Sequence, residues 1–160
     1  MNRTLILIIF VVFAVLLRLV PHPPNFAPIT ALALFSSITF RNKLSGAIVP
    51  LSAMLISDIF LGFYSISIWV YGAFVAVNLF GSNFKTVNTL NILISSLIFF
   101  IISNFGVWVL GYPKTLEGLI LCYSLAIPFF AYSILGDFFF SYVLKYSFKF
   151  VENRWAIVKS

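Results

Sequence analysis

Polar side chains interrupt the apolar stretches of this chain at a few positions, and their types suggest ligand binding. Arg18, His22 and Asn25 stand close together around a proline-rich turn, and Asp58 lies inside an apolar segment. An ionised side chain at the centre of a membrane costs roughly 2.5–3.5 kcal/mol, so Asp58 requires a partner in such a setting. Arg18 is the predicted partner. The pair is interpreted either as a structural tie between two helices or as part of a ligand site.

His22 is the only histidine of the chain and stands between prolines. It could bind a metal, carry a proton or form a hydrogen bond to a ligand. The chain has one cysteine, Cys122, and Asp58 is the carboxylate expected nearby, so a metal site lacks ligands. Nucleophile-elbow, zinc-protease and phosphate-loop motifs are absent from the sequence. We therefore expect a hydrogen-bonding role for His22, and no metal, cofactor or enzymatic activity.

Asn104 and Trp108 are four residues apart in an apolar segment, so they share one face of a helix. An amide is poorly accommodated by lipid, and this face is therefore expected to look into the protein. The alternative for Trp108 is an aromatic belt at the membrane surface. The same alternative applies to Trp69, Tyr71, Tyr112 and Tyr123.

The composition indicates what holds these side chains. Hydrophobic residues make up 62% of the chain and charged residues 9%, with a mean hydropathy of +1.10, whereas about a quarter of the residues of a soluble protein are charged. We predict an integral membrane protein with a single domain over residues 1–160. The net charge of +6 lies at segment ends, so it indicates membrane topology and a lipid bilayer as partner, not nucleic acid.

The predicted fold is all-α, a polytopic bundle of six transmembrane helices. The predicted helices are residues 4–20, 26–40, 44–62, 68–80, 89–110 and 116–144, and residues 145–160 form a basic cytoplasmic tail. The prolines at 21–24 exclude helix between the first two segments. Asn25 is predicted to cap the second helix, with Pro28 in its first turn. Pro128 is predicted to kink the sixth helix.

Basic residues are distributed unevenly between the two sides of this bundle. The side of the bundle away from the two termini has only Arg18 and Lys114. The side with both termini has Arg3, Arg41, Lys43, Lys85, Lys145, Lys149, Arg154 and Lys159. The positive-inside rule therefore places both termini in the cytoplasm. Asp137 then falls near the cytoplasmic end of its helix, close to Lys145, and is interpreted as a solvated or paired charge.

Four segments of the sequence resemble a known family. They are RLVPHPPNFAPITALALF at 18–35, VPLSAMLISDIFLGF at 49–63, SNFGVWVLGYPKTLEGLILCY at 103–123 and IPFFAYSILGDFFF at 127–140. They resemble an uncharacterised family of small bacterial membrane proteins with a PHPPNFxP motif, described as transport proteins. That family is similar in size and layout to the S components of energy-coupling-factor vitamin transporters, which implies six helices and an outward pocket. Ser36 and Ser37 replace a glycine pair usual in the family.

The residues and the resemblance together predict a small-molecule transport protein of the bacterial inner membrane. It is expected to be the substrate-binding or translocating subunit, energised by partner subunits or an ion gradient. One alternative is a structural or lipid-interacting bundle without transport, and another is a membrane enzyme that uses His22 and Asp58. The predicted ligand is small, partly polar and partly aromatic or apolar. The predicted cavity is walled by Arg18, His22, Asn25, Asp58, Asn104 and Trp108.

Overall fold

The computed structural model describes residues 3–21, 23, 25–40 and 43–159, and helix is the only regular secondary structure in them. The six helices are α1 (Arg3–Leu19), α2 (Ile29–Thr39), α3 (Lys43–Leu61), α4 (Ser67–Gly81), α5 (Thr89–Gly111) and α6 (Leu116–Lys159). The predicted all-α class and the six helices are thus confirmed.

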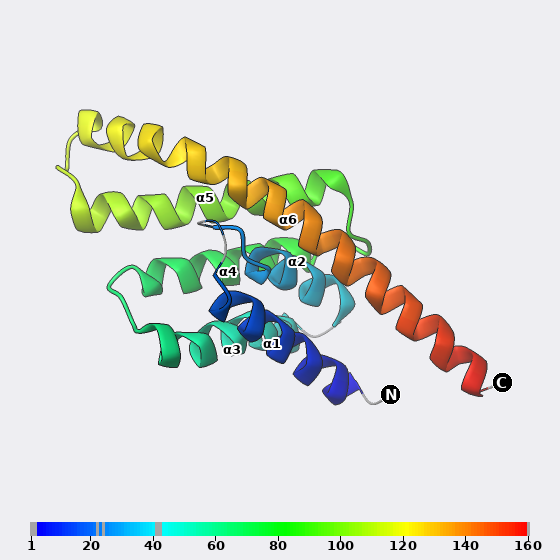
Figure 1. The fold of residues 1–160 in the computed structure, drawn as a ribbon. Helices are drawn as coiled ribbons and strands as arrows, with labels where there is room; N and C mark the ends of the chain where they lie inside the picture. Colours follow the sequence, from blue (N-terminus) through cyan, green and yellow to red (C-terminus); the bar gives the residue numbers. More distant parts are fainter. Residues whose placement is uncertain (1–2, 22, 24, 41–42, 160) are drawn as a thin grey trace.

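The helices are arranged around α2 (Figure 1). α5 and α6 lie side by side on one flank, and α1 and α3 lie on the other. α2 lies between the two flanks and contacts each of the other five helices. The two termini lie at one end of the molecule, and the turns that join α3 to α4 and α5 to α6 lie at the opposite end (Figure 1).

α2 is buried on every side, from Ile29 through Ser37. A helix that is apolar all round belongs in the interior of a protein. Its 11 residues measure about 16 Å, much less than the roughly 30 Å of a bilayer core. The ends of α2 therefore lie within the depth of the bundle, and protein must satisfy their backbone groups.

Small residues bring the neighbouring helices close to α2. The hydroxyl of Ser36 donates a hydrogen bond to the carbonyl oxygen of Gly46 on α3, at 2.8 Å. A methyl group added at Gly81 on α4 would lie 2.0 Å from the Ser37 hydroxyl oxygen. The serine pair therefore serves as the small surface that close helix packing needs.

The predicted start of the second helix is wrong. α2 begins at Ile29 with Pro28 at the N-cap position, and no side chain caps it. Asn25 has a φ of 62°, in the left-handed region that asparagine tolerates better than most residues. The physical reason is Pro28, which disfavours helical backbone at Ala27 and so delays the helix. Asn25 is a turn residue, not a helix cap.

The predicted end of the sixth helix at Leu144 is also wrong. α6 continues to Lys159 as one helix of 44 residues, about 66 Å long, with Pro128 inside it. Aromatic packing explains part of this continuation. The ring of Phe148 lies 5.5 Å from that of Phe35 on α2 and 6.4 Å from that of Phe10 on α1. The Lys145 ammonium donates to the carbonyl oxygen of Val87, at 2.8 Å.

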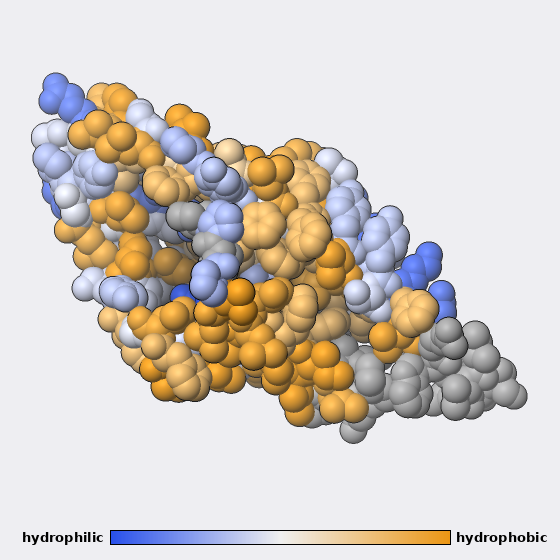
Figure 2. Space-filling view, viewed as in Figure 1, coloured by the Kyte–Doolittle hydropathy of each residue, from blue (hydrophilic) through white to orange (hydrophobic). Residues whose placement is uncertain are grey.

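The surface is apolar over long stretches, as a membrane requires. α3, α5 and α6 contain segments long and apolar enough to cross a bilayer, whereas the described apolar parts of the other three helices are shorter. Large hydrophobic side chains such as Ile59 and Phe60 on α3 are about two-thirds exposed. Figure 2 shows apolar residues over most of the visible face, with hydrophilic residues near the α5–α6 turn and along the distal part of α6. These features indicate a membrane protein.

Candidate functional site

A cavity of about 340 Å³ lies between the α5–α6 flank and the other helices. Figure 2 shows the visible face hollowed between these two parts. The polar residues that line the cavity are Arg18, Asn25, Thr30 and Ser133, and the aromatic ones are Phe74 and Phe99. All six helices and the turn before α2 thus contribute to its walls. The volume lies within the range of small-molecule sites, about 300–1,000 Å³.

One wall of the cavity includes Arg18, which forms an ion pair with Asp58; Asp58 itself, predicted to line the cavity, is not among its lining residues. The guanidinium Nη1 lies 2.5 Å from Asp58 Oδ1. The same nitrogen donates to the hydroxyl of Ser57 and to the carbonyl oxygen of Met54. Asp58 is 2% exposed, whereas the Arg18 side chain retains 21% of its surface and lines the cavity. The pair that the sequence predicted is therefore present and ties α1 to α3.

Tyr71 completes the surroundings of Asp58. Its hydroxyl donates to Asp58 Oδ2, so both carboxylate oxygens are engaged and α4 joins α1 and α3. The contact between Tyr71 and Asp58 was not predicted from the sequence. The Tyr71 phenol at the start of α4, at the depth predicted for Asp58, was the available signal. Ser57 was signalled only by its position beside Asp58.

The proline turn contributes Asn25 to the cavity. Asn25 lines the cavity and is exposed, which places it at the cavity's margin. His22, also predicted to line it, lies outside the described residues. Within the described part of the chain, no group of three or more His, Cys, Asp or Glu side chains could hold a metal ion.

Asn104 and Trp108 do not line this cavity, so their predicted placement on its wall is wrong. The Asn104 amide donates to the carbonyl oxygen of Phe100, at 2.8 Å. The Trp108 indole donates to the carbonyl oxygen of Pro113, at 2.9 Å, and the Lys114 ammonium lies 5.5 Å from the ring. Trp108 thus ties the end of α5 to the turn before α6, whereas the Asn104 side chain bonds within α5. A shared depth in the bundle did not determine which way α5 is rotated.

Asp137 on α6 is as buried as Asp58, at 2% exposure. Its Oδ2 accepts a hydrogen bond of 2.6 Å from Ser96 on α5, and Thr30 on α2 also interacts with the carboxylate. In the described part of the chain, no lysine or arginine pairs with it. The prediction of a solvated or Lys145-paired charge is wrong because this face of α6 is covered by α5 and α2.

Hydroxyl groups connect Asp137 to the cavity. Thr30 lines the cavity and interacts with Asp137. Ser133 also lines the cavity and stands one helical turn before Asp137 on α6, on the same face. Ser141 stands one turn after it and is buried, and its hydroxyl oxygen has no hydrogen-bond partner among the described residues. The positions of Thr30, Ser96 and Ser133 near Asp137 or the cavity were not predicted from the sequence. Hydroxyl groups in otherwise apolar helices were the signal that could have indicated them.

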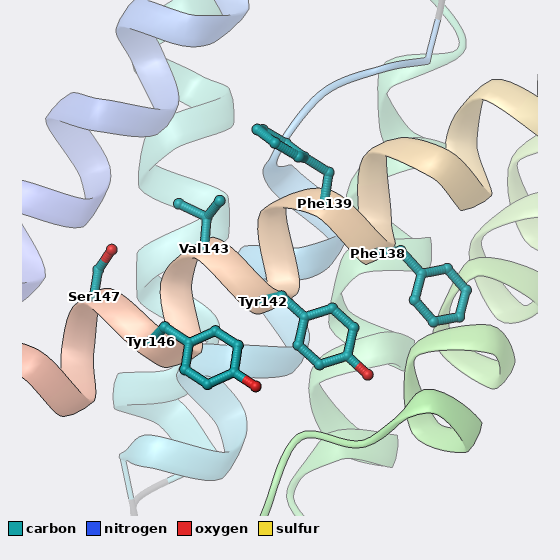
Figure 3. A pocket seen from close by; sticks show the side chains of 6 residues that line it. All are labelled: Phe138, Phe139, Tyr142, Val143, Tyr146 and Ser147. Atoms are coloured by element: carbon teal, nitrogen blue, oxygen red, sulfur yellow. The ribbon is translucent and has the colours of Figure 1, made fainter.

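A second hollow, of about 560 Å³, runs along the surface of α6. Figure 3 shows Phe138, Tyr142 and Tyr146 projecting to one side of the helix and Phe139 and Val143 to the other. Residues of a single helix line this groove, so it lacks the enclosing walls that a small polar ligand requires. The cavity lined by Arg18 and Thr30 is the better candidate for such a ligand.

Comparison with known proteins identifies the family. Residues 1–158 match the model of a family of unknown function, DUF6580, and the chain belongs to this family. Neither the curated proteins nor the solved structures gave a match.

Proposed function

We propose that this protein binds a small molecule in the cavity and serves as the substrate-binding or translocating subunit of an uptake system in the bacterial inner membrane. The observation that carries the proposal is a cavity, lined by residues of all six helices of a membrane bundle, that presents one arginine, compensated by one aspartate. Intramembrane ionisable residues that face a cavity commonly mark ligand or ion pathways. Energy would come from partner subunits or an ion gradient.

In the proposed topology six helices are inserted in the membrane and both termini are cytoplasmic. Two observations support it. The termini lie at the same end of the molecule (Figure 1). The topology predicted from the sequence places most of the basic residues on the side that carries the termini. Reporter fusions after Lys85 and Ser160 should read cytoplasmic, and a fusion after Lys114 should read external. An external carboxyl terminus would reverse the orientation.

The lining of the cavity suggests the chemistry of the ligand. Arg18 can donate to a carboxylate or carbonyl, but Asp58 already offsets its charge, so a zwitterion or a molecule with one acidic group fits better than a polyanion. Phe74 and Phe99 supply a flat apolar wall, with ring centroids 5.0 Å apart. They take the aromatic role that the sequence analysis assigned to Trp108.

A ligand of this kind should raise the melting temperature of the protein in lipid nanodiscs. The probes are aromatic amino acids, nucleobases and pyridine carboxylates. At about 100 times Kd, binding to the folded state adds about 2.7 kcal/mol of stability. The shift should be lost when Arg18→Gln and Asp58→Asn are combined, because that change removes the polar wall without leaving an unpaired charge.

Trp108→Leu is the control, since Trp108 does not line the cavity. It should leave the affinity within about twofold, about 0.4 kcal/mol. A ligand that stabilised the double variant as well as the wild type would bind elsewhere. If no probe of these classes shifted the melting temperature, the alternative of a structural or lipid-interacting bundle would take precedence.

The groove on α6 is the observation that favours that alternative, because its mostly apolar walls suit an acyl chain. The reading as an enzyme has less support. Both oxygens of Asp58 already accept hydrogen bonds from Arg18 and Tyr71, so this carboxylate is poorly placed to act as a general base. We therefore propose a non-enzymatic protein.

A further inference from the structure

Asp137 has no role in the ligand chemistry described above, yet it is the more unusual of the two buried aspartates. The helices packed against α6 are α5 and α2. Neither contains a charged residue. α5 presents the Ser96 hydroxyl to the carboxylate, and α2 presents Thr30. Arg18, the charged residue that lines the cavity, is already paired with Asp58. Lys145, two turns after Asp137 on α6, donates to the carbonyl oxygen of Val87.

An ionised carboxylate in these surroundings is unfavourable, because hydroxyl groups offset only part of the cost of removing a charge from water. The cost disappears when a cation binds. A multivalent metal is a poor candidate, since calcium requires six to eight oxygen ligands and the described residues offer one carboxylate here. The smallest cation, a proton, needs no ligand shell.

The Thr30 hydroxyl provides a route for that proton, because Thr30 lines the cavity and interacts with Asp137. Ser133 also lines the cavity, but its hydroxyl donates to the carbonyl oxygen of Phe129 on its own helix. A hydroxyl donates one proton and accepts another, so it can relay a proton between water in the cavity and the carboxylate. A protonated carboxyl also needs an acceptor for its own hydrogen bond. The Ser141 oxygen, buried and without a described partner, stands one turn away on the same helix face.

We propose that Asp137 is a proton-binding site that exchanges protons with the cavity through Thr30. A proton from water in the cavity converts the carboxylate to a carboxylic acid, and the same route returns it. Any coupling of this step to uptake of a ligand rests on the proposed transport function. The protonation itself does not.

Infrared difference spectroscopy of the protein in lipid nanodiscs tests the proposal without a ligand. Asp58 and Asp137 are the only aspartates of the chain, so isotope-labelled aspartate separates their carboxyl bands from those of the glutamates. We expect one protonated aspartate band at neutral pH. The band should disappear in Asp137→Asn, persist in Arg18→Gln with Asp58→Asn, and shift within seconds of transfer to heavy water.

Two further variants keep the test decisive if Asp137→Asn does not fold. Thr30→Val removes a hydroxyl at nearly constant volume and should change the frequency of the band, because that frequency reports hydrogen bonding. Ser124→Ala, at an exposed serine of the same helix, should not change it.

Absence of a protonated aspartate band in the wild type at every pH at which the protein stays folded would overturn the proposal. So would a melting temperature that rises with sodium, compared with choline, in the wild type but not in Asp137→Asn, because a metal cation would then occupy the site. These outcomes leave the ligand test untouched. Failure to find a ligand likewise leaves the infrared result standing, so the two failures are distinguishable.

Discussion

The two aspartates of this protein are equally buried and each contacts a residue that lines the cavity, but their surroundings differ in kind. Asp58 is held by the guanidinium of Arg18 and the phenol of Tyr71, which join α1 and α4 to α3. Asp137 is held by hydroxyls of Ser96 and Thr30, which join α5 and α2 to α6. The same burial therefore supports a fixed charge at one aspartate and a carboxyl without a fixed partner charge at the other.

The difference indicates that the surroundings of the two aspartates suit different roles. On the Asp58 side, one arginine nitrogen contacts three oxygens of α3, so the cation and the anion define each other's positions. On the Asp137 side, the groups around the carboxylate can each donate or accept, so their hydrogen bonds can be rearranged at little cost. The first arrangement suits a rigid wall, and the second suits a site that changes its protonation.

The largest expected effect comes from breaking the ion pair. Asp58→Asn alone leaves Arg18 partly buried without its counter-charge and should lower the free energy of unfolding by about 3–5 kcal/mol. Asp58→Asn with Arg18→Gln should cost less than Asp58→Asn alone. Unfolding of the four proteins of this double-mutant cycle in detergent measures the coupling. Simple additivity of the two single changes would show that the pair contributes nothing.

A smaller effect is expected from Tyr71→Phe, which keeps the ring and removes one hydrogen bond to an ionised carboxylate. Such a bond contributes about 1.5–3 kcal/mol. The loss should be seen in the unfolding free energy of the single variant and should shrink when Asp58 is already asparagine. Tyr64→Phe is the matched control, because the Tyr64 hydroxyl is exposed and bonds only a nearby carbonyl oxygen, that of Leu61. Equal losses in both variants would remove Tyr71 from the Asp58 cluster.

The smallest effect is expected from Asp137→Asn, in contrast with Asp58→Asn. If Asp137 carries a proton, asparagine replaces a neutral group of nearly the same shape, and the unfolding free energy should change by about 1 kcal/mol or less. The same unfolding measurement applies at neutral pH. A loss as large as that of Asp58→Asn would mean that Asp137 is ionised and paired, and the contrast between the two aspartates would be withdrawn.

The sequence predicted the features that depend on the local spacing of residues and on the small number of charged residues in apolar segments. Pro50, Met54 and Asp58 recur every four residues, a spacing that places them on one face of a helix, and all three are buried in α3. Arg18 was expected to meet Asp58 because few opposite charges share that depth, and the pair is present.

The sequence did not reveal how α5 and α6 are rotated about their axes. These helices are apolar on nearly every face, so the apolar pattern does not distinguish the inward face from the outward one. Asp137 was therefore assigned to solvent and Asn104 to the cavity, and both assignments are wrong. The start of α2 was misjudged for a local reason, the effect of Pro28 on the residue before it.

The burial of α2 also bears on how the chain is assembled. Four of the five helices that surround α2 come after it in the sequence, and α6 is the last of them. Until they emerge from the ribosome, the hydroxyls of Thr30 and Ser36 and the polar ends of this short helix would face lipid, which cannot satisfy them. The burial of α2 on the side that faces α6 can therefore be completed only after α6 has been synthesised. The centre of this bundle is in that sense the last part of the protein to be assembled.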